Sequence, residues 1–198
     1  MLFNIIICLM CYLICSLNPA IIICKRKTGQ DIRTLGSGNA GTTNAIRVLG
    51  KGWGIAVFIL DASKAFICYM LMLLFSKIFN EQIDIAANSF FLIFTVLGHC
   101  YPVYYKFQGG KGITTLLVSA LCVNKQIAIV CIVVGIIIIL ITRTVSKGSL
   151  CGVLLYVIMM IVMMPEYIFP ALITSSIVIF RHKQNIIRIM NKEEQKLF

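Results

Sequence analysis

Three polar segments interrupt an otherwise apolar chain, and each combines residue types that bind phosphate in proteins. They are residues 37–47 (SGNAGTTNAIR), 98–112 (GHCYPVYYKFQGGKG) and 181–188 (RHKQNIIR). Polar side chains are costly in hydrocarbon unless they line a wet cavity or pair with one another. Their concentration between apolar stretches therefore predicts a site for an anionic ligand.

The composition is that of an integral membrane protein. Of the 198 residues, 60% are hydrophobic and 13% are charged, and the mean hydropathy is +0.96, far from the usage of soluble proteins. The formal net charge of +11 could indicate nucleic-acid binding. The basic residues, however, cluster between apolar segments rather than on one soluble face, so no nucleic-acid partner is expected. We predict a single polytopic membrane domain over residues 1–198.

The apolar pattern predicts an all-α protein with about seven transmembrane helices. The apolar segments are residues 3–24, 53–79, 85–97, 113–122, 127–141, 149–164 and 167–180. The third and fourth are shorter than the roughly 17 to 25 residues that a span needs, so a re-entrant or interfacial path stays open for both. If neither crosses the membrane, five spans remain and the C-terminus keeps its side.

The basic residues predict the orientation. With the N-terminus outside, all of the 18 Lys and Arg residues except Lys64, Lys77 and Lys125 fall on the cytoplasmic side. Cytoplasmic loops are enriched in Lys and Arg, which favours this orientation. The C-terminus and all three polar segments would then lie at the cytoplasmic face.

The first polar segment is typical of a loop that enters a helix. Glycines such as Gly41 let the backbone approach a ligand, and the free amides of a helix N-terminus attract an anion. Arg47 adds a guanidinium whose planar fork suits phosphate. A plain polar turn followed by a cytoplasmic arginine is the alternative. The candidate ligands are Ser37, Asn39, Gly41, Thr43, Asn44 and Arg47.

The second polar segment carries His99 near its start and ends in GGKG. It is not a Walker motif, because Tyr105 stands where the first glycine is required and Gly112 where serine or threonine follows the lysine. Nucleotide hydrolysis is therefore not expected. The consecutive amides of residues 109–112 could form an anion nest, with the ammonium of Lys111 beside it. A glycine-rich turn between helices is the alternative.

In the third polar segment, His182, Asn185 and Arg188 recur every three residues and would share one broad helical face. Two or three of them could reach one ligand. A basic tail beneath a final span can equally serve as a topology determinant that contacts membrane lipid.

Two further features are expected to be structural. Asp61 and Lys64 form an i, i+3 pair in the second apolar segment, and we assign the pair a supporting role although ionisable residues in a membrane often mark function. Most of the nine cysteines lie in apolar runs, where a thiol behaves as a small hydrophobe. The seven acidic residues are not clustered. We therefore expect neither a metal nor another cofactor.

All three polar segments resemble those of the acyl-phosphate:glycerol-3-phosphate acyltransferases, the PlsY family of bacterial membranes. The first is similar to the pattern SxNxGxTNxxR and the second to GHxxPxxxxFxGGKG. The third is similar to RHxENIxR, with Gln184 where the family carries glutamate. Residues 61–65 (DASKA) resemble the family's DxxKG, with Ala65 in place of glycine. The order of the segments extends this resemblance over nearly the whole chain.

The resemblance implies transfer of a fatty acyl group from acyl phosphate to the 1-hydroxyl of sn-glycerol 3-phosphate, giving lysophosphatidic acid and phosphate. It implies a bacterial inner membrane with the site facing the cytoplasm, and a soluble enzyme that supplies acyl phosphate as a partner. An acyl phosphate is already activated, so no covalent nucleophile is required. In agreement, the chain has neither a GxSxG elbow nor an HxxxxD motif.

Within that reaction, we assign Arg47, Lys111 and Arg188 to phosphate charge. Hydrogen bonds from Ser37, Asn39 and Asn185 would orient the substrates. Either His182 or a phosphate oxygen of the substrate would act as the base, and the sequence leaves both open. The predicted catalytic residues are Ser37, Arg47, Lys111, His182 and Asn185. The predicted substrate-binding residues are Asn39, Gly41, Thr43, Asn44, His99, Gly109, Gly110, Gly112 and Arg188.

A transporter or channel for a phosphorylated solute is the alternative function, because basic loops and re-entrant segments would also capture anions. That function predicts internal repeats and polar residues at the bilayer midplane, whereas the polar residues of this chain gather towards one face.

Overall fold

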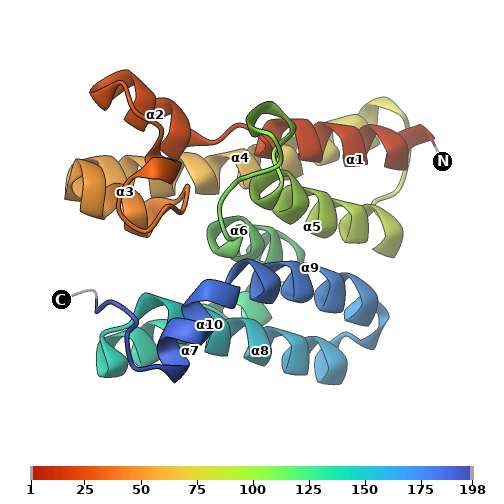
Figure 1. Ribbon diagram of the computed structural model, residues 1–198. Coiled ribbons are helices and arrows are strands. Elements are labelled where there is room, and N and C mark those ends of the chain that lie inside the picture. The colour runs from red at the N-terminus through yellow and green to blue at the C-terminus, as the bar shows by residue number, and fades with distance from the viewer. Residues whose placement is uncertain (1, 197–198) are drawn as a thin grey trace.

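The computed structural model describes residues 2–196, and these residues form helices and no strand (Figure 1). The α-helices are α1 (Leu2–Cys15), α2 (Pro19–Thr28), α3 (Thr42–Leu49), α4 (Lys51–Ile78), α5 (Ile85–Cys100), α6 (Ile113–Val123), α7 (Lys125–Thr142), α8 (Val145–Met163), α9 (Ile168–Arg181) and α10 (Lys183–Met190). Three single 3₁₀ turns lie at Ile32–Thr34, Val103–Tyr105 and Pro165–Tyr167.

The first apolar segment was expected to be continuous over residues 3–24, but the chain breaks after Cys15. Asn18 caps α2 by accepting a hydrogen bond from the Ile21 amide at 3.1 Å, and Pro19 follows in the first turn. Proline has no amide to continue the preceding helix, and an Asn–Pro pair favours a new helix start. The break places α2 at an angle to α1.

Five helical stretches are long and apolar enough to cross a membrane: Leu2–Thr28, Lys51–Ile78, Ile85–Tyr105, Lys125–Thr142 and Val145–Met163. The α6 helix has 11 residues and rises only about 16 Å, roughly half of a hydrocarbon core. The α9 helix is also short, at 14 residues. The count of seven spans therefore stays a prediction.

Several helices extend beyond the predicted apolar segments, and two of these extensions include residues that line the cavity described below. The α5 helix continues past residue 97 to Cys100, because its polar His99 is buried against partners from α4 and so does not need to leave the helix. The α8 helix begins four residues before the predicted residue 149, at Val145. This earlier start places Ser146 in the helix, at the polar end of the protein.

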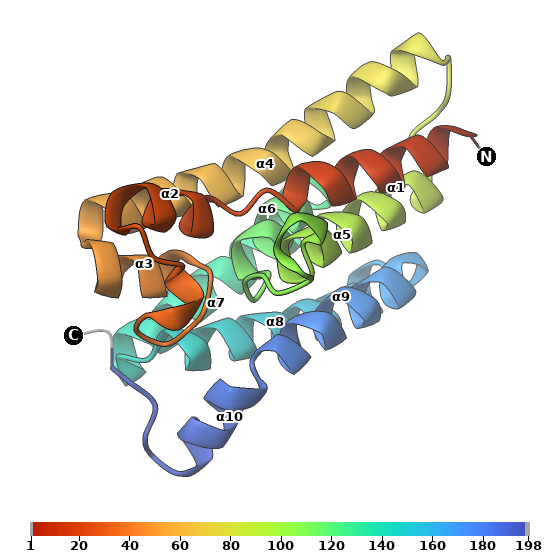
Figure 2. The ribbon, with the colours of Figure 1, turned by 45° about the horizontal axis from the view of Figure 1, so that its top comes forward.

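Two groups of long helices sandwich the short α6. Helices α1, α4 and α5 lie on one side and α7, α8 and α9 on the other, with α6 between them (Figures 1 and 2). The short helices α2, α3 and α10 gather towards the end of the bundle opposite the start of the chain. This arrangement brings the first and third polar segments, which are far apart in sequence, towards the same end.

The outer surfaces of the long helices suit lipid. Large apolar side chains on α1, α4, α7 and α8 are exposed, including Leu9, Ile55, Leu140 and Ile158. In water such a surface would be unfavourable, whereas in a bilayer the lipid chains cover it. The protein is therefore a multi-pass integral membrane protein, as its composition predicted.

Candidate active site

The three polar segments meet at one place, and two arginines join them. Nη1 of Arg33, in the loop between α2 and α3, donates to the Tyr105 carbonyl at 2.9 Å. Arg181, at the end of α9, donates to the carbonyls of Gly109 at 2.6 Å and Gly110 at 3.0 Å. Arg33 precedes the first polar segment by four residues and Arg181 begins the third, so these bonds hold the second segment close to both.

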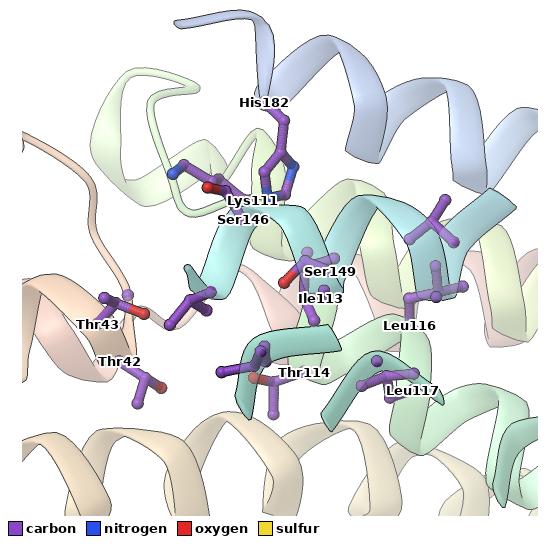
Figure 3. Close-up of a pocket in the computed structure, with 18 of the residues that line it drawn as sticks. Thr42, Thr43, Lys111, Ile113, Thr114, Leu116, Leu117, Ser146, Ser149 and His182 are labelled. Atoms are coloured by element: carbon purple, nitrogen blue, oxygen red, sulfur yellow. The ribbon is translucent and has the colours of Figure 1, made fainter. Parts of the chain in front are cut away.

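A cavity of about 400 Å³ opens where the segments meet. Figure 3 shows its two parts: Thr42, Thr43, Lys111 and His182 surround one end, whereas Leu116 and Leu117 of α6 lie towards the other. The predicted site residues that line this cavity are Ser37, Asn39, Gly41, Thr43, Asn44, Arg47, His99, Lys111, Gly112, His182 and Asn185. Arg188 lines a smaller adjoining recess together with Ser37 and Arg47.

The apolar part of the cavity runs between α6, α7 and α8. It is lined by side chains such as Leu121, Ile132 and Tyr156. Helices α7 and α8 approach closely beside it, and glycine at position 148 permits this approach. A Cβ added at Gly148 would overlap the carbonyl oxygen of Gly135. The cavity therefore joins a polar end to an apolar arm.

The α3 helix begins at the polar end of the cavity. Its first intrahelical bond runs from the Ala45 amide to the Gly41 carbonyl at 3.0 Å, so the amides of the first turn, including those of Thr42 and Thr43, have no helical acceptor. The lining threonines bring these amides to the cavity. An anion there would meet the positive end of the helix.

Asn44 shapes the loop that precedes α3. Its Oδ1 accepts from the Ser37 amide at 2.8 Å, and its Nδ2 donates to the carbonyls of Leu35 at 3.0 Å and Ile32 at 3.3 Å. A Cβ at Gly36 would overlap this Oδ1. The sequence grouped Asn44 with the substrate ligands, but the side chain is occupied in positioning Ser37.

The four-residue anion nest expected at residues 109–112 needs correction. The amides of Gly109 and Gly110 donate to the carbonyls of Cys100 and His99, each at 3.1 Å, so they are used inside the loop. In the part of the chain that the structure describes, the amides of Lys111 and Gly112 have no such acceptor. They precede the first turn of α6, and of the amides of residues 109–112 these two remain available to an anion.

A buried cluster of Asp61, Lys64 and His99 lies beneath this loop. Nζ of Lys64 lies 2.8 Å from Asp61 Oδ1, 2.9 Å from His99 Nδ1 and 3.0 Å from the Leu17 carbonyl. His99 Nδ1 also lies 3.3 Å from Asp61 Oδ1, so this nitrogen faces the ion pair and Nε2 is the ring nitrogen on the far side. A Cβ at Gly110 would overlap this Nε2. The supporting role predicted for Asp61 and Lys64 thus extends to His99, which reaches the cavity edge but also braces the loop.

His182 lies between α9 and α10 and points into the cavity (Figure 3). Its Nδ1 lies 2.8 Å from the Val178 carbonyl. A carbonyl only accepts, so Nδ1 carries the proton and Nε2 has a free lone pair. Burial lowers the pKa of His182 to about 4, and nearby Lys111 acts in the same direction. The ring is therefore neutral at pH 7 and can accept a hydrogen bond.

Lys111 is the cation at the centre of the polar end. Burial lowers its pKa to about 8, the positive charges of Arg188, Arg47 and Arg181 contribute to the same effect, and Glu194 opposes it. Cations of like sign held in one cavity repel one another unless an anion joins them. The polar end is thus electrostatically complementary to phosphate.

Three residues of this region received no role from the sequence, although Arg181 begins the third polar segment. Arg33 and Arg181 brace the loop, and Glu194 of the tail accepts hydrogen bonds from Asn185 at 2.6 Å and from Arg188 at 2.7 Å. No spacing rule marks such contacts, because each joins groups that only the fold brings together.

The two departures from the family pattern fall outside the cavity lining. Gln184 is exposed on α10, next to the buried Asn185. Ala65 is fully buried within α4, and its methyl group is accommodated in the packing.

The chain resembles proteins whose identity is known. A family model described as glycerol-3-phosphate acyltransferase matches residues 5–192. A glycerol-3-phosphate acyltransferase of Clostridioides difficile (strain 630) is 37% identical over 98% of this chain and 95% of its own length. The corresponding Aquifex aeolicus (strain VF5) protein is 35% identical over 93% of this chain and 94% of its own length.

Solved structures agree. The crystal structure of PlsY (YgiH), an integral membrane glycerol 3-phosphate acyltransferase in its glycerol 3-phosphate form, superposes with a TM-score of 0.87 at 33% identity and covers 98% of this chain and 94% of its own. Its lysophosphatidic acid form gives 0.83 at 31% identity, with the same coverage. With the family model matching nearly the whole chain, this protein belongs to the PlsY family of glycerol-3-phosphate acyltransferases.

Proposed function

We propose that the protein transfers a fatty acyl group from acyl phosphate to the 1-hydroxyl of sn-glycerol 3-phosphate and releases lysophosphatidic acid and phosphate. One observation carries this proposal: a single cavity joins a cationic polar end to an apolar arm between membrane helices. Both substrates contain a phosphate, and the donor also contains a long apolar chain. The known relatives named above act on glycerol 3-phosphate.

The polar end would hold the two phosphates. Arg47, Lys111 and Arg188 supply the charge. The first-turn amides of α3 and the amides of Lys111 and Gly112 supply neutral donors. The hydroxyl of Ser37 and the amides of Asn39 and Asn185 would orient the substrates. The acyl chain would enter the apolar arm, where its burial is favourable by about 0.8 kcal/mol per methylene relative to water.

The reaction needs little from the protein beyond position and charge. The 1-hydroxyl oxygen forms a bond to the acyl carbon, and the bond from that carbon to the phosphate oxygen breaks. Neutral His182 would accept a hydrogen bond from the hydroxyl through Nε2 and orient it. Because the pKa of His182 lies near 4, well below pH 7, this ring holds a proton poorly. We therefore assign the hydroxyl proton to a phosphate oxygen of the substrate.

The Lys111 ammonium and the free amides beside it would stabilise the tetrahedral oxyanion and the departing phosphate. Removal of one preorganised donor of this kind costs about 100- to 1,000-fold in turnover. The site would face the cytoplasm of a bacterial inner membrane, as the distribution of basic residues predicts. Acyl phosphate would then arrive from a soluble enzyme on that side.

The test mixes the purified protein with acyl phosphate and glycerol 3-phosphate and measures lysophosphatidic acid, with acyl-CoA as the competing donor. We expect product from acyl phosphate only. Lys111→Ala should lower turnover about 100-fold. Lys106→Ala changes an exposed lysine of the same loop and should leave turnover near the wild-type value.

Product from acyl-CoA alone would overturn the donor assignment. Equal turnover of both lysine variants would remove the role of Lys111. If no product forms but vesicles containing the protein take up glycerol 3-phosphate, the transporter alternative replaces the enzyme.

A further inference from the structure

The C-terminal tail turns back onto the polar end of the cavity. After α10 ends, Lys192 adopts a left-handed conformation with φ +61°, and the Glu193 amide donates to the Arg188 carbonyl at 2.7 Å. This turn directs Glu194 towards α8 and α10. Its side chain is only 9% exposed, although the residues on either side of it are exposed.

The Glu194 carboxylate uses both oxygens as acceptors. Oε1 accepts from Asn185 Nδ2 at 2.6 Å and from Ser146 Oγ at 2.8 Å, and Oε2 accepts from Arg188 Nε at 2.7 Å. These bonds hold the pKa of Glu194 below its usual range, against the opposing effect of burial. Glu194 is also close enough to Lys111 to raise the pKa of that lysine.

The partners of Glu194 overlap with the groups that bind phosphate in the proposed function. Asn185, Arg188 and Lys111 are assigned to the substrates in the proposed function, and Glu194 lines both the cavity and the adjoining recess. A carboxylate and a phosphate share the features that matter here, namely negative charge and several acceptor oxygens. The same donors cannot satisfy both anions at once.

We infer that Glu194 is a positioning residue that takes the place of a substrate phosphate, keeps Asn185 and Arg188 over the empty site, and yields that place when substrate binds. This inference rests on the proposed function, because it requires the polar end to bind phosphate. Without substrate, the carboxylate offsets the repulsion among the cations of the polar end. With substrate, it competes for the same donors.

Competition raises the apparent dissociation constant of the substrate. The apparent constant equals the intrinsic constant divided by the fraction of molecules in which the tail is released. If the carboxylate is docked about 90% of the time, the apparent dissociation constant rises about tenfold. Removing the carboxylate should therefore tighten phosphate binding. A purely structural acidic residue would have the opposite effect, because its loss would loosen Asn185 and Arg188 and weaken binding.

The experiment compares Glu194→Gln with Glu193→Gln in the full-length protein. The two variants remove the same charge from adjacent positions at the adjoining recess. The Glu193 side chain is exposed, however, and among the described residues it makes none of the hydrogen bonds or ion pairs that hold Glu194. Calorimetry measures the binding of inorganic phosphate and of glycerol 3-phosphate. We expect about tenfold tighter binding for Glu194→Gln and less than about twofold change for Glu193→Gln.

Kinetics provide the second readout. Glu194→Gln should lower KM for glycerol 3-phosphate about tenfold and change kcat less, because the competitor acts on ground-state binding. A chain that ends at Lys192 removes the whole tail and should reproduce the tighter binding. This second variant does not depend on how glutamine packs at position 194.

Equal or weaker phosphate binding by both Glu194→Gln and the shortened chain would overturn the inference. So would equal tightening by Glu194→Gln and Glu193→Gln, which would indicate a general effect of charge. If the wild-type protein and all variants bind neither phosphate nor glycerol 3-phosphate, the proposed function itself fails. The two failures are therefore distinct.

Discussion

Raising the pH should switch off substrate capture as Lys111 loses its proton. Burial, together with the surrounding arginines, lowers the pKa of this lysine to about 8. Its ammonium is then about 90% protonated at pH 7 and about 10% at pH 9, whereas an ordinary lysine would stay charged over this range. If only the charged form captures phosphate, kcat/KM falls about tenfold between pH 7 and pH 9.

Both kinetic constants should fall as the pH rises, but at different pH values. A bound phosphate stabilises the ammonium and raises its pKa, so the fall in kcat should lie at higher pH than the fall in kcat/KM, which reports the free enzyme. The substrate phosphate loses its second proton near pH 6, so it stays a dianion throughout the window. The fall in kcat/KM above pH 7, the alkaline limb of the pH profile, therefore reports a group of the protein and not the substrate phosphate.

Initial rates of lysophosphatidic acid formation from pH 6.5 to 10 measure the effect, with hydrolysis of the donor in the absence of protein subtracted. Glu194 raises the pKa of Lys111, so Glu194→Gln should move the limb to lower pH. Lys111→Arg keeps its charge throughout and should remove the limb, at some loss of rate. A flat profile for the wild type, or an unchanged limb in Lys111→Arg, would refute the assignment.

Three further changes test the cavity and its support. Gly110→Ala should lower turnover at least about 100-fold by displacing the imidazole beneath it and the loop donors above, and activity assays measure this. Lys64→Met should destabilise the protein by about 3–5 kcal/mol, because it leaves the Asp61 carboxylate buried without its ion-pair partner, and unfolding in detergent measures this. Tyr156→Ala should favour longer acyl phosphates by enlarging the apolar arm, and competition between two chain lengths measures this.

Each of these changes has an outcome that would contradict it. Gly52→Ala is the control for the first, because an added Cβ there meets nothing within 4 Å, and similar losses in both variants would discount the contact at Gly110. Unchanged stability of Lys64→Met would argue against a buried ion pair. An unchanged chain-length preference in the third variant would place the acyl chain elsewhere.

The sequence alone determined that this is a membrane protein and which residues lie at the polar end of the cavity. Composition requires a bilayer, because so many apolar side chains cannot be buried within 198 residues. Residues within one polar segment are close because they are near in sequence, so motif spacing could predict that His182, Asn185 and Arg188 share a face. The apolar pattern likewise located the long helices, although it missed the break between α1 and α2 that precedes Pro19.

Only the tertiary structure decided which of those groups are free to bind a ligand. Asn44 and the amides of Gly109 and Gly110 have the right chemistry but are occupied by neighbouring loop atoms. Glu194 showed no signal in the sequence, yet the turn after α10 brings it to the phosphate donors. Whether a polar group binds substrate or braces a loop depends on hydrogen bonds between distant segments, and helix packing sets those bonds.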